Sequence, residues 1–218
     1  LILGLHGYQL TAADQKHLTE AVESLQQVSP ENRRLSTVAS LLPTHLAEQL
    51  HPWVGNGRWG KHFDNSEDGF SLSDFMAIGM NAIMEDPTLA RAFLDYAFYR
   101  IDRQLDGRPT VIYLEEAWIL LAHEGFVFKV VDWMKTLAKK NAILVLATQS
   151  LEEVSDSTAF ASLVDNMATW VFLPNPAALA HVDLYRGRFG LNNTQIDMIR
   201  KAAPKRDYII YRPWERLT

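Results

Sequence analysis

The sequence predicts a layered α/β domain with a largely parallel sheet, preceded by a helical segment. From residue 70 onward, short apolar runs alternate with stretches of helical periodicity, which is typical of crossover units in α/β proteins. Before residue 70, apolar residues recur at helical spacing instead. We therefore expect residues 1–69 to form a helical segment and a loop, and residues 70–218 to form the α/β part, within one domain overall.

The helical segment is predicted to hold three helices followed by a loop. The helices cover a stretch that Thr11 caps and that ends near Pro30, then residues 35–42, then residues 46–50. Residues 51–69 are rich in Gly, Asn and Asp, which predicts a loop. We expect its tryptophans, Trp53 and Trp59, to point inward.

Five apolar runs predict the strands of the α/β part. They are residues 75–80, 111–114, 143–147, 169–173 and 208–211. Asp86 and Pro87 open a helix between the first two strands, and Gly107 closes it. A second helical stripe over residues 126–137 lies between the next two strands. Right-handed crossovers of this length place both helices where they cover the sheet.

Composition excludes several classes of function. The chain has 218 residues, a net charge of −5 and no cysteine. The acidic balance disfavours a surface built to grip nucleic acid, although a local basic patch is compatible with it. The lack of cysteine excludes disulfides and thiolate zinc sites. No apolar run approaches the roughly 20 residues of a membrane-spanning helix, so we expect any membrane association to be peripheral.

Two adjacent carboxylates follow the strand predicted over residues 111–114. Ligands bind at the C-terminal ends of strands in open α/β sheets, and Glu115 and Glu116 stand at that end. Phosphoryl transfer needs one acidic group near a magnesium ion and another that orients or deprotonates the attacking water. Glu115 would take the metal role and Glu116 the water role. The alternative is that both glutamates are a solvated helix start, where carboxylates favour the helix dipole.

Polar residues also follow the strand predicted over residues 143–147. Thr148 and Gln149 are placed to sense a γ-phosphate or the water beside it. The alternative is helix capping, in which Thr148 or Ser150 satisfies free amides of the next helix. The two interpretations are compatible with each other.

Six segments in fixed order resemble the TrbE/CagE-type conjugation and secretion ATPases. They are Phe63–Asp68, an acidic loop; Val111–Trp118, a Walker B stretch; Asp132–Asn141, a helix motif; Ala147–Ser150, a glutamine motif; Phe172–Pro176, a proline-asparagine turn; and Tyr185–Leu191. The resemblance covers roughly residues 50–211. Ordered motifs of this number are far harder to obtain by chance than any one alone.

The resemblance implies a RecA-like P-loop NTPase fold, a three-layer sandwich with a mostly parallel sheet. It implies a ring, expected to be a hexamer, on the cytoplasmic side of a bacterial inner membrane among other secretion components. Such a ring hydrolyses ATP with Mg²⁺ to drive pilus assembly and substrate transfer. Carried onto this sequence, the family pattern gives catalytic roles to Glu116, Gln149 and Thr148, a metal role to Glu115, and nucleotide contacts to Glu115, Gln149, Lys140 and Arg188.

Two residues depart from the family pattern. Glu115 stands where the Walker B stretch usually has aspartate, although its longer side chain still reaches a metal-bound water. Ala138 stands where the helix motif usually has an arginine. If that arginine acts on the nucleotide of a neighbouring subunit, the cations nearby in sequence are Lys139, Lys140, Arg186 and Arg188. Lysine lacks the planar fork that suits a phosphate.

The phosphate-binding loop is absent from the sequence. Nowhere is G-x-x-x-x-G-K followed by Ser or Thr, and Gly55–Lys61 follows no apolar strand, so it is predicted to be a turn. In RecA-like sheets the phosphate-loop strand lies between the strand leading to Gln149 and the later strands. We therefore expect a gap in the sheet, with edges that re-pair or shift. We also expect the sequence, which starts at Leu1 without methionine, to begin downstream of a missing segment, and the fragment not to bind ATP.

Three functions remain in competition. The first is a motor ATPase that is competent only with its upstream segment. The second is a noncatalytic interaction module of the secretion machinery, in which the carboxylates are relics. The third is a ring DNA translocase of the same superfamily, which the acidic balance disfavours.

Overall fold

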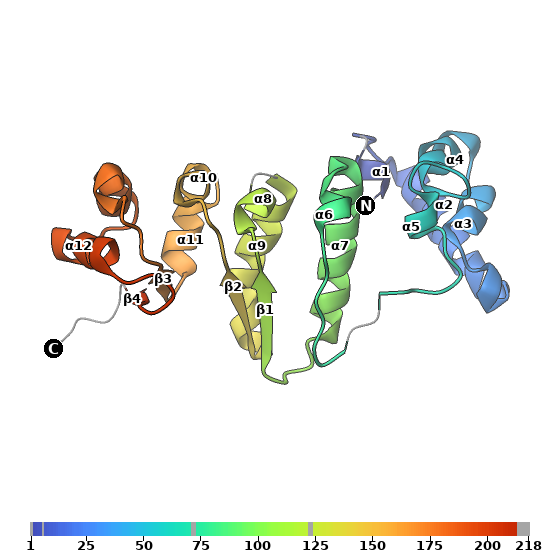
Figure 1. Cartoon of the computed structure of the whole chain (residues 1–218). Coiled ribbons are helices and arrows are strands. Elements are labelled where there is room, and N and C mark those ends of the chain that lie inside the picture. Colours follow the sequence, from blue (N-terminus) through green and yellow to red (C-terminus); the bar gives the residue numbers. More distant parts are fainter. Residues whose placement is uncertain (1, 6, 71–72, 122–123, 213–218) are drawn as a thin grey trace. The chain divides into compact units, whose positions relative to one another are not determined.

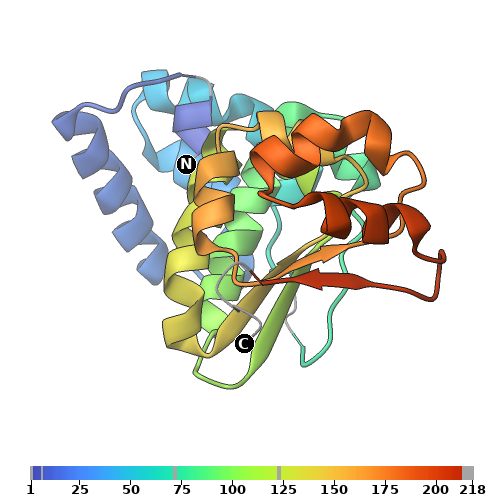
Figure 2. The same ribbon diagram turned by 90° about the vertical axis from the view of Figure 1, so that its left-hand side faces the viewer.

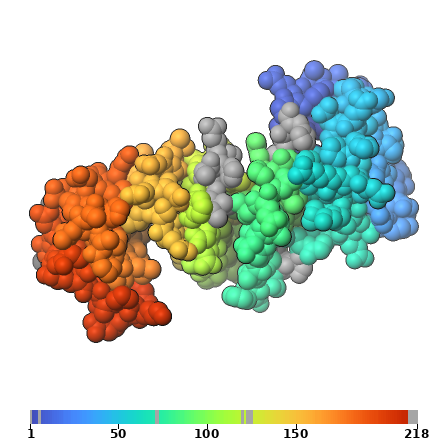
Figure 3. Space-filling view, turned by 45° about the horizontal axis from the view of Figure 1, so that its top comes forward, coloured from blue at the N-terminus to red at the C-terminus, as the bar shows by residue number. Residues whose placement is uncertain are grey.

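The computed structural model describes residues 2–5, 7–70, 73–121 and 124–212 (Figure 1). The chain divides into two compact units, which we call the helical unit (Leu1–Gln104) and the strand unit (Leu105–Thr218). Among the described residues, which are coloured in Figure 3, no helix is both long and apolar enough to cross a membrane.

The division between the compact units differs from the predicted boundary between residues 69 and 70. Helix α7 (Pro87–Gln104) belongs to the helical unit, because its Leu89 and Ala92 pack against Trp53 and Trp59. Compactness does not test which segments belong to a motor domain. The assignment of residues 70–218 to that domain therefore remains a prediction.

The helical unit contains seven helices within its described residues. They are α1 (Ile2–Leu5), α2 (Ala12–Ser24), α3 (Leu35–Leu41), α4 (Thr44–Leu50), α5 (Gly60–Phe63), α6 (Asn81–Met84) and α7. Thr11 caps α2 as predicted: its hydroxyl accepts from the Asp14 amide at 3.2 Å, and the Asp14 carboxylate accepts from the Thr11 amide at 3.0 Å. The three helices predicted for this region are confirmed.

Two apolar clusters stabilise the helical unit. One joins Leu3, Ala21, Leu42, Leu46 and Leu50 from α1 to α4. The other forms around Trp53, whose side chain is fully buried and whose ring lies 4.4 Å from that of Trp59. The prediction of inward tryptophans is thus confirmed, because the two rings form the core onto which α7 packs. The predicted loop is interrupted by a 3-10 turn at His51–Trp53 and by helix α5.

The strand predicted over residues 75–80 is wrong. Residues 73–80 form no strand, and the side chain of Phe75 is 87% exposed. A strand needs a neighbour for its backbone groups, and no described strand pairs with this run. An apolar run alone therefore does not specify a strand here.

The strand unit alternates strands and helices from Thr110 onward (Figure 2). Its elements are β1 (Thr110–Leu114), α8 (Ala117–Leu121), α9 (Glu124–Thr136), β2 (Ala142–Leu146), α10 (Leu151–Asp156), α11 (Phe160–Asn166), β3 (Trp170–Phe172), α12 (Asn193–Lys201) and β4 (Ile209–Tyr211). A 3-10 turn at Leu137–Lys140 links α9 to β2, and a π-helical turn spans Leu184–Arg188. The last four predicted strands are confirmed.

The described strands form two separate two-stranded sheets rather than one largely parallel sheet. Strand β1 pairs with β2 in parallel, with Thr110 opposite Ala142 and Leu114 opposite Leu146. Strand β3 pairs with β4 antiparallel. The prediction of a mostly parallel sheet is corrected for this second pair. Strand direction depends on how distant segments meet, which a local apolar pattern does not encode.

The strands bury only one face. Leu114, Leu144 and Leu146 pack toward an apolar core built from the helices, in which the largest fully buried members include Val130 of α9, Leu163 of α11 and Ile196 of α12. The alternate residues on the opposite face are apolar yet exposed: Val111, Tyr113, Ile143, Val145, Val171 and Ile210. Continuous apolar composition is typical of strands that are covered on both faces.

Candidate functional site

Main-chain hydrogen bonds continue between the two chain segments just after β1 and β2 end. The Ala147 amide donates to the Leu114 carbonyl at 2.9 Å, and the Ala117 amide donates to the Ala147 carbonyl at 2.9 Å. These two bonds extend the parallel ladder into the turns that follow both strands. The residues just beyond β1 and β2 are therefore fixed side by side.

Glu116 and Gln149 are in direct contact at these strand ends. The Gln149 side-chain amide donates to Glu116 Oε1 at 2.5 Å. The sequence predicted that the two side chains would lie together, and the structure places them in a hydrogen bond. Glu116 is partly buried and Gln149 is exposed, so the pair lies at the surface of the strand unit.

Glu116 has a second partner that sequence reasoning missed. The indole N–H of Trp118 donates to Glu116 Oε2 at 2.9 Å, so each carboxylate oxygen accepts one N–H. The backbone of Glu116 is left-handed, with φ at 51°, which is uncommon for a residue other than glycine. The one signal in the sequence was the position of Trp118, two residues beyond Glu116 in the stretch that resembles a Walker B motif.

Glu115 is exposed beside this pair. Within the described parts of the chain, no three His, Asp or Glu side chains gather as a metal cage. Mg²⁺ is commonly bound through one or two carboxylates plus waters and substrate phosphates. A single exposed carboxylate at a strand end fits that donor set, and it does not fit a metal that needs several protein ligands.

Thr148 and Ser150 make the local contacts of a turn and a helix cap. Thr148 Oγ1 accepts from the Ser150 amide at 3.1 Å, and Ser150 Oγ accepts from the Glu153 amide at 3.3 Å at the start of α10. The capping interpretation therefore describes both side chains. The catalytic role of Thr148 stays a prediction.

The structure does not bring Lys140 and Arg188 to the carboxylate of Glu116. Lys140 precedes β2 whereas Gln149 follows it, so about 17 Å of strand separates the two ends. The Arg188 guanidinium lies 3.8 Å from an oxygen of Asp156 and 5.8 Å from the ring centre of Phe160. Nucleotide contacts by these two residues remain a prediction.

In the glycine-rich segment Gly55–Lys61, residues 55–59 form the predicted turn, whereas Gly60 and Lys61 begin the short helix α5. Its amides are used inside the protein: that of Gly55 donates to Asp64 Oδ2 at 2.8 Å, that of Gly57 to the Val54 carbonyl at 2.8 Å, and that of Gly60 to the Gly57 carbonyl at 3.0 Å. A phosphate loop needs such amides free to face the ligand. This segment therefore does not offer a phosphate cradle.

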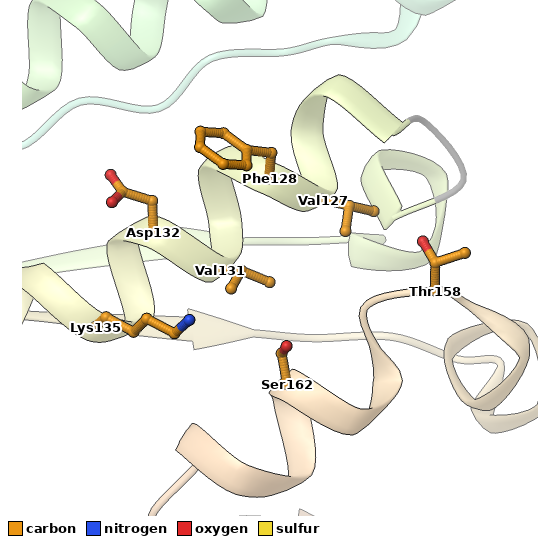
Figure 4. Close-up of a pocket in the computed structure, with 7 residues that line it drawn as sticks. All are labelled: Val127, Phe128, Val131, Asp132, Lys135, Thr158 and Ser162. Carbon is orange, nitrogen blue, oxygen red and sulfur yellow. The ribbon is translucent and has the colours of Figure 1, made fainter.

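A shallow groove of about 470 Å³ lies elsewhere in the strand unit, between α9 and α11 (Figure 4). Figure 4 shows its lining: Val127, Phe128, Val131, Asp132 and Lys135 of α9, with Thr158 and Ser162. None of these is a predicted site residue. The groove is therefore separate from the glutamate pair.

Comparison with known proteins gives the relationship of this chain. It is 32% identical over 217 residues to a probable conjugal transfer protein TrbE of Sinorhizobium fredii, a match that covers 98% of this chain. It is also 34% identical over 180 residues to the conjugal transfer protein TrbE of Rhizobium radiobacter, covering 81% of this chain. The chain is a homologue of TrbE and VirB4. The type IV secretion system protein VirB4 of Bartonella quintana is 27% identical to this chain over 204 residues, a match that covers 91% of this chain.

The chain corresponds to only a portion of its TrbE and VirB4 relatives. It spans 32%, 22% and 26% of the lengths of these three proteins. Among solved structures, VirB4 of Thermoanaerobacter pseudethanolicus matches with a TM-score of 0.59 and 15% identity, over 97% of this chain and 66% of that one. That match shows a shared mixed helix and strand fold. No protein-family model matches the chain.

Proposed function

We propose that this chain is the C-terminal portion of a motor ATPase of a conjugation or type IV secretion system. In the intact protein it hydrolyses ATP to power pilus assembly and substrate transfer. The observation that carries the proposal is the contact of Glu116 with Gln149 at the ends of two paired parallel strands. Homology to TrbE and VirB4 supplies the type of system.

Glu116 and Gln149 have the chemistry that hydrolysis needs. Glu116 accepts a proton from a water molecule whose oxygen bonds to the γ-phosphorus of ATP, while the bond from that phosphorus to the bridging oxygen breaks and ADP leaves. The Gln149 amide orients the water or the γ-phosphate. Glu115 would hold Mg²⁺ through its waters, and the ion would supply positive charge that offsets the charge on the phosphates.

The split between the two sheets supports an incomplete RecA-like sandwich. Strand β2 pairs with β1, strand β3 pairs with β4, and no described strand joins β2 to β3. A phosphate-loop strand in a RecA-like sheet lies between the strand that ends at the glutamine motif and the later strands. The apolar strand face left exposed here suits a layer contributed by the rest of the intact protein.

The proposed function also implies an assembly of several subunits. In the intact protein we place the motor in a ring, a hexamer, bound peripherally at the cytoplasmic face of the inner membrane beside other secretion components. A positive residue from a neighbouring subunit would complete the nucleotide site, and Arg188 is the candidate because its guanidinium suits a phosphate better than the amine of Lys140.

A noncatalytic interaction module is the second candidate. Two observations favour it: Ala138 stands where the helix motif usually has an arginine, and the amides of Gly55, Gly57 and Gly60 donate to acceptors inside the protein. In that case the intact protein binds its partners but does not turn over ATP. A ring DNA translocase remains disfavoured by the net charge of −5.

The test compares ATP turnover by the intact protein with that of Glu116→Gln. We expect the substitution to lower kcat by roughly a hundredfold or more while ATP binding persists, because the amide accepts no proton. Glu153→Gln, an exposed glutamate on α10, is the matched control and should leave kcat unchanged. Unchanged turnover in Glu116→Gln would remove Glu116 from the mechanism.

Calorimetry on this chain alone tests the assignment of the phosphate site. We expect no measurable ATP binding, because no phosphate cradle is present in its sequence. Tight binding by the chain alone would contradict the assignment of the phosphate site to another segment.

A further inference from the structure

We propose that Trp118 is a positioning residue for Glu116. Its indole N–H fixes one carboxylate oxygen of Glu116. The other oxygen then releases the Gln149 amide and accepts a hydrogen bond from the attacking water instead. This inference rests on the proposed function and deepens it. It is carried by the two hydrogen bonds at Glu116, by the difference in burial between the two donors, and by the backbone conformation of Glu116.

The two donors differ in how firmly they are held. Trp118 lies in the first turn of α8, is partly buried and packs against the apolar core of the strand unit. An indole has one donor on a rigid ring with two side-chain torsions, so packing of the ring fixes the direction of its N–H. Gln149 is exposed and has more torsions. Of the two, Gln149 is therefore the exchangeable partner.

The backbone at Glu116 explains how a residue only two positions away reaches its carboxylate. The left-handed φ of 51° turns the chain sharply between β1 and α8. The hydrogen bonds of Leu114 and Ala117 with Ala147 on either side hold this turn against the strain. A non-glycine residue keeps such a conformation only where its surroundings enforce it. The turn therefore directs the Glu116 side chain to the Trp118 indole.

The two oxygens of Glu116 then have different tasks. Oε2 accepts from Trp118 at 2.9 Å and stays anchored, whereas Oε1 accepts from Gln149 at 2.5 Å. When Gln149 turns to the nucleotide, Oε1 is left facing the space at the strand ends and can accept a proton from water. Without the indole, the carboxylate would rotate about its side-chain torsions and lose this orientation.

Kinetics of the intact protein test the role of Trp118. In Trp118→Phe the ring is kept and the N–H donor is lost, and we expect kcat to fall roughly tenfold to a hundredfold with KM nearly unchanged. Trp170→Phe is the matched control, because Trp170 packs against the same core but does not contact Glu116. Equal kcat values for the two variants would overturn the proposal. A Trp118→Phe variant that changes only KM and not kcat would also overturn it.

A nuclear magnetic resonance measurement on this chain separates the contact from the activity. With ¹⁵N-labelled tryptophan, we expect the Trp118 indole resonance to shift in Glu116→Ala and to stay in place in Glu153→Ala. An indole resonance that does not move in Glu116→Ala would overturn the positioning role. If the intact protein turns over no ATP while that resonance shifts, the proposed function fails although the contact itself stands.

Discussion

Three aspartates of the helical unit and the two glutamates of the candidate site are bound in different ways. In the helical unit, Asp14, Asp64 and Asp86 each accept two or more hydrogen bonds, and main-chain amides are among the donors every time. In the strand unit, Glu115 is exposed and Glu116 is held by two side chains. A carboxylate bound by the backbone of its own fold stabilises local structure. One bound by side chains can change partners.

The core around Trp53 and the outer face of the strands also differ in how far their apolar side chains are covered. The helical unit surrounds Trp53, which has no exposed area. The strand unit leaves the outer face of its strands open, with Val111 at 65% and Ile143 at 59% exposed. Exposed apolar patches of this kind mark interaction surfaces. The core around Trp53 is thus enclosed within the helical unit, while the outer face of the strands is exposed.

The largest expected effect concerns the enclosed core around Trp53. Trp53→Ala should destabilise the protein by about 3–5 kcal/mol, because it removes the centre of the cluster that joins the 51–69 loop to α7. Urea denaturation followed by circular dichroism measures it. Tyr99→Ala is the control, since Tyr99 is 53% exposed on α7. Equal losses for the two variants would contradict a core role for Trp53.

The next effect concerns the turn that resembles a phosphate loop. A Cβ at position 57 would lie 2.3 Å from the His51 carbonyl oxygen, so Gly57→Ala should cost about 1–3 kcal/mol as the backbone shifts. Gly69→Ala is the matched control, because a Cβ there has no neighbour within 4 Å. Thermal unfolding compares the two variants. A neutral Gly57→Ala would mean that the turn is looser than its hydrogen bonds indicate.

A pH effect is expected at Asp14. The hydrogen bond from His45 and then those from Thr11 hold the pKa of Asp14 well below its ordinary value of 3.8. A carboxylate with a lowered pKa stabilises the fold fully above that ordinary value, and the stabilisation is lost as the pH falls through the folded pKa. Stability should therefore fall more steeply below about pH 4 in the natural protein than in Asp14→Asn.

Urea midpoints at pH 5 and at pH 3 measure that difference. Glu48→Gln, an exposed residue of α4, is the control and should keep the steep fall. If Asp14→Asn and Glu48→Gln respond alike to acid, the Asp14 contacts do not contribute to stability in solution.

The smallest effect tests the open face of the strand unit. Ile143→Thr should change the stability of this chain by no more than about 0.5 kcal/mol, because the side chain is mostly exposed. In the intact protein the same substitution should cost more if another segment covers that face. Equal effects in the chain and in the intact protein would show that the face stays open.

Local pattern predicted much of the fold. Caps and periodicity located the helix after Thr11 and the one from Pro87, since both signals act within a few residues. The run at residues 75–80 failed because strand formation depends on a partner elsewhere in the chain. The antiparallel pairing of β4 with β3 was not predicted for the same reason, as it joins segments far apart in sequence.

The part of the candidate site that depends on strand pairing was predictable from the sequence. Glu116 and Gln149 follow adjacent parallel strands, so their contact is a consequence of register. The indole of Trp118 was not predictable, because its reach depends on the left-handed backbone at Glu116, which no residue-type preference signals. Lys140 lies at the other end of β2 from Gln149, because proximity in sequence does not set which end of a strand a residue occupies, and its nucleotide contact stays a prediction.

The separation of the strands into two pairs has a consequence for amide exchange with solvent. Each strand of a two-stranded sheet has one side without a neighbour, so among the described strands half of the ladder positions offer their N–H groups outward. Such amides exchange with deuterated water quickly unless another chain segment bonds to them. Slow exchange along the outer edges of β2 and β3 in the full-length protein would therefore locate the segment that bridges them.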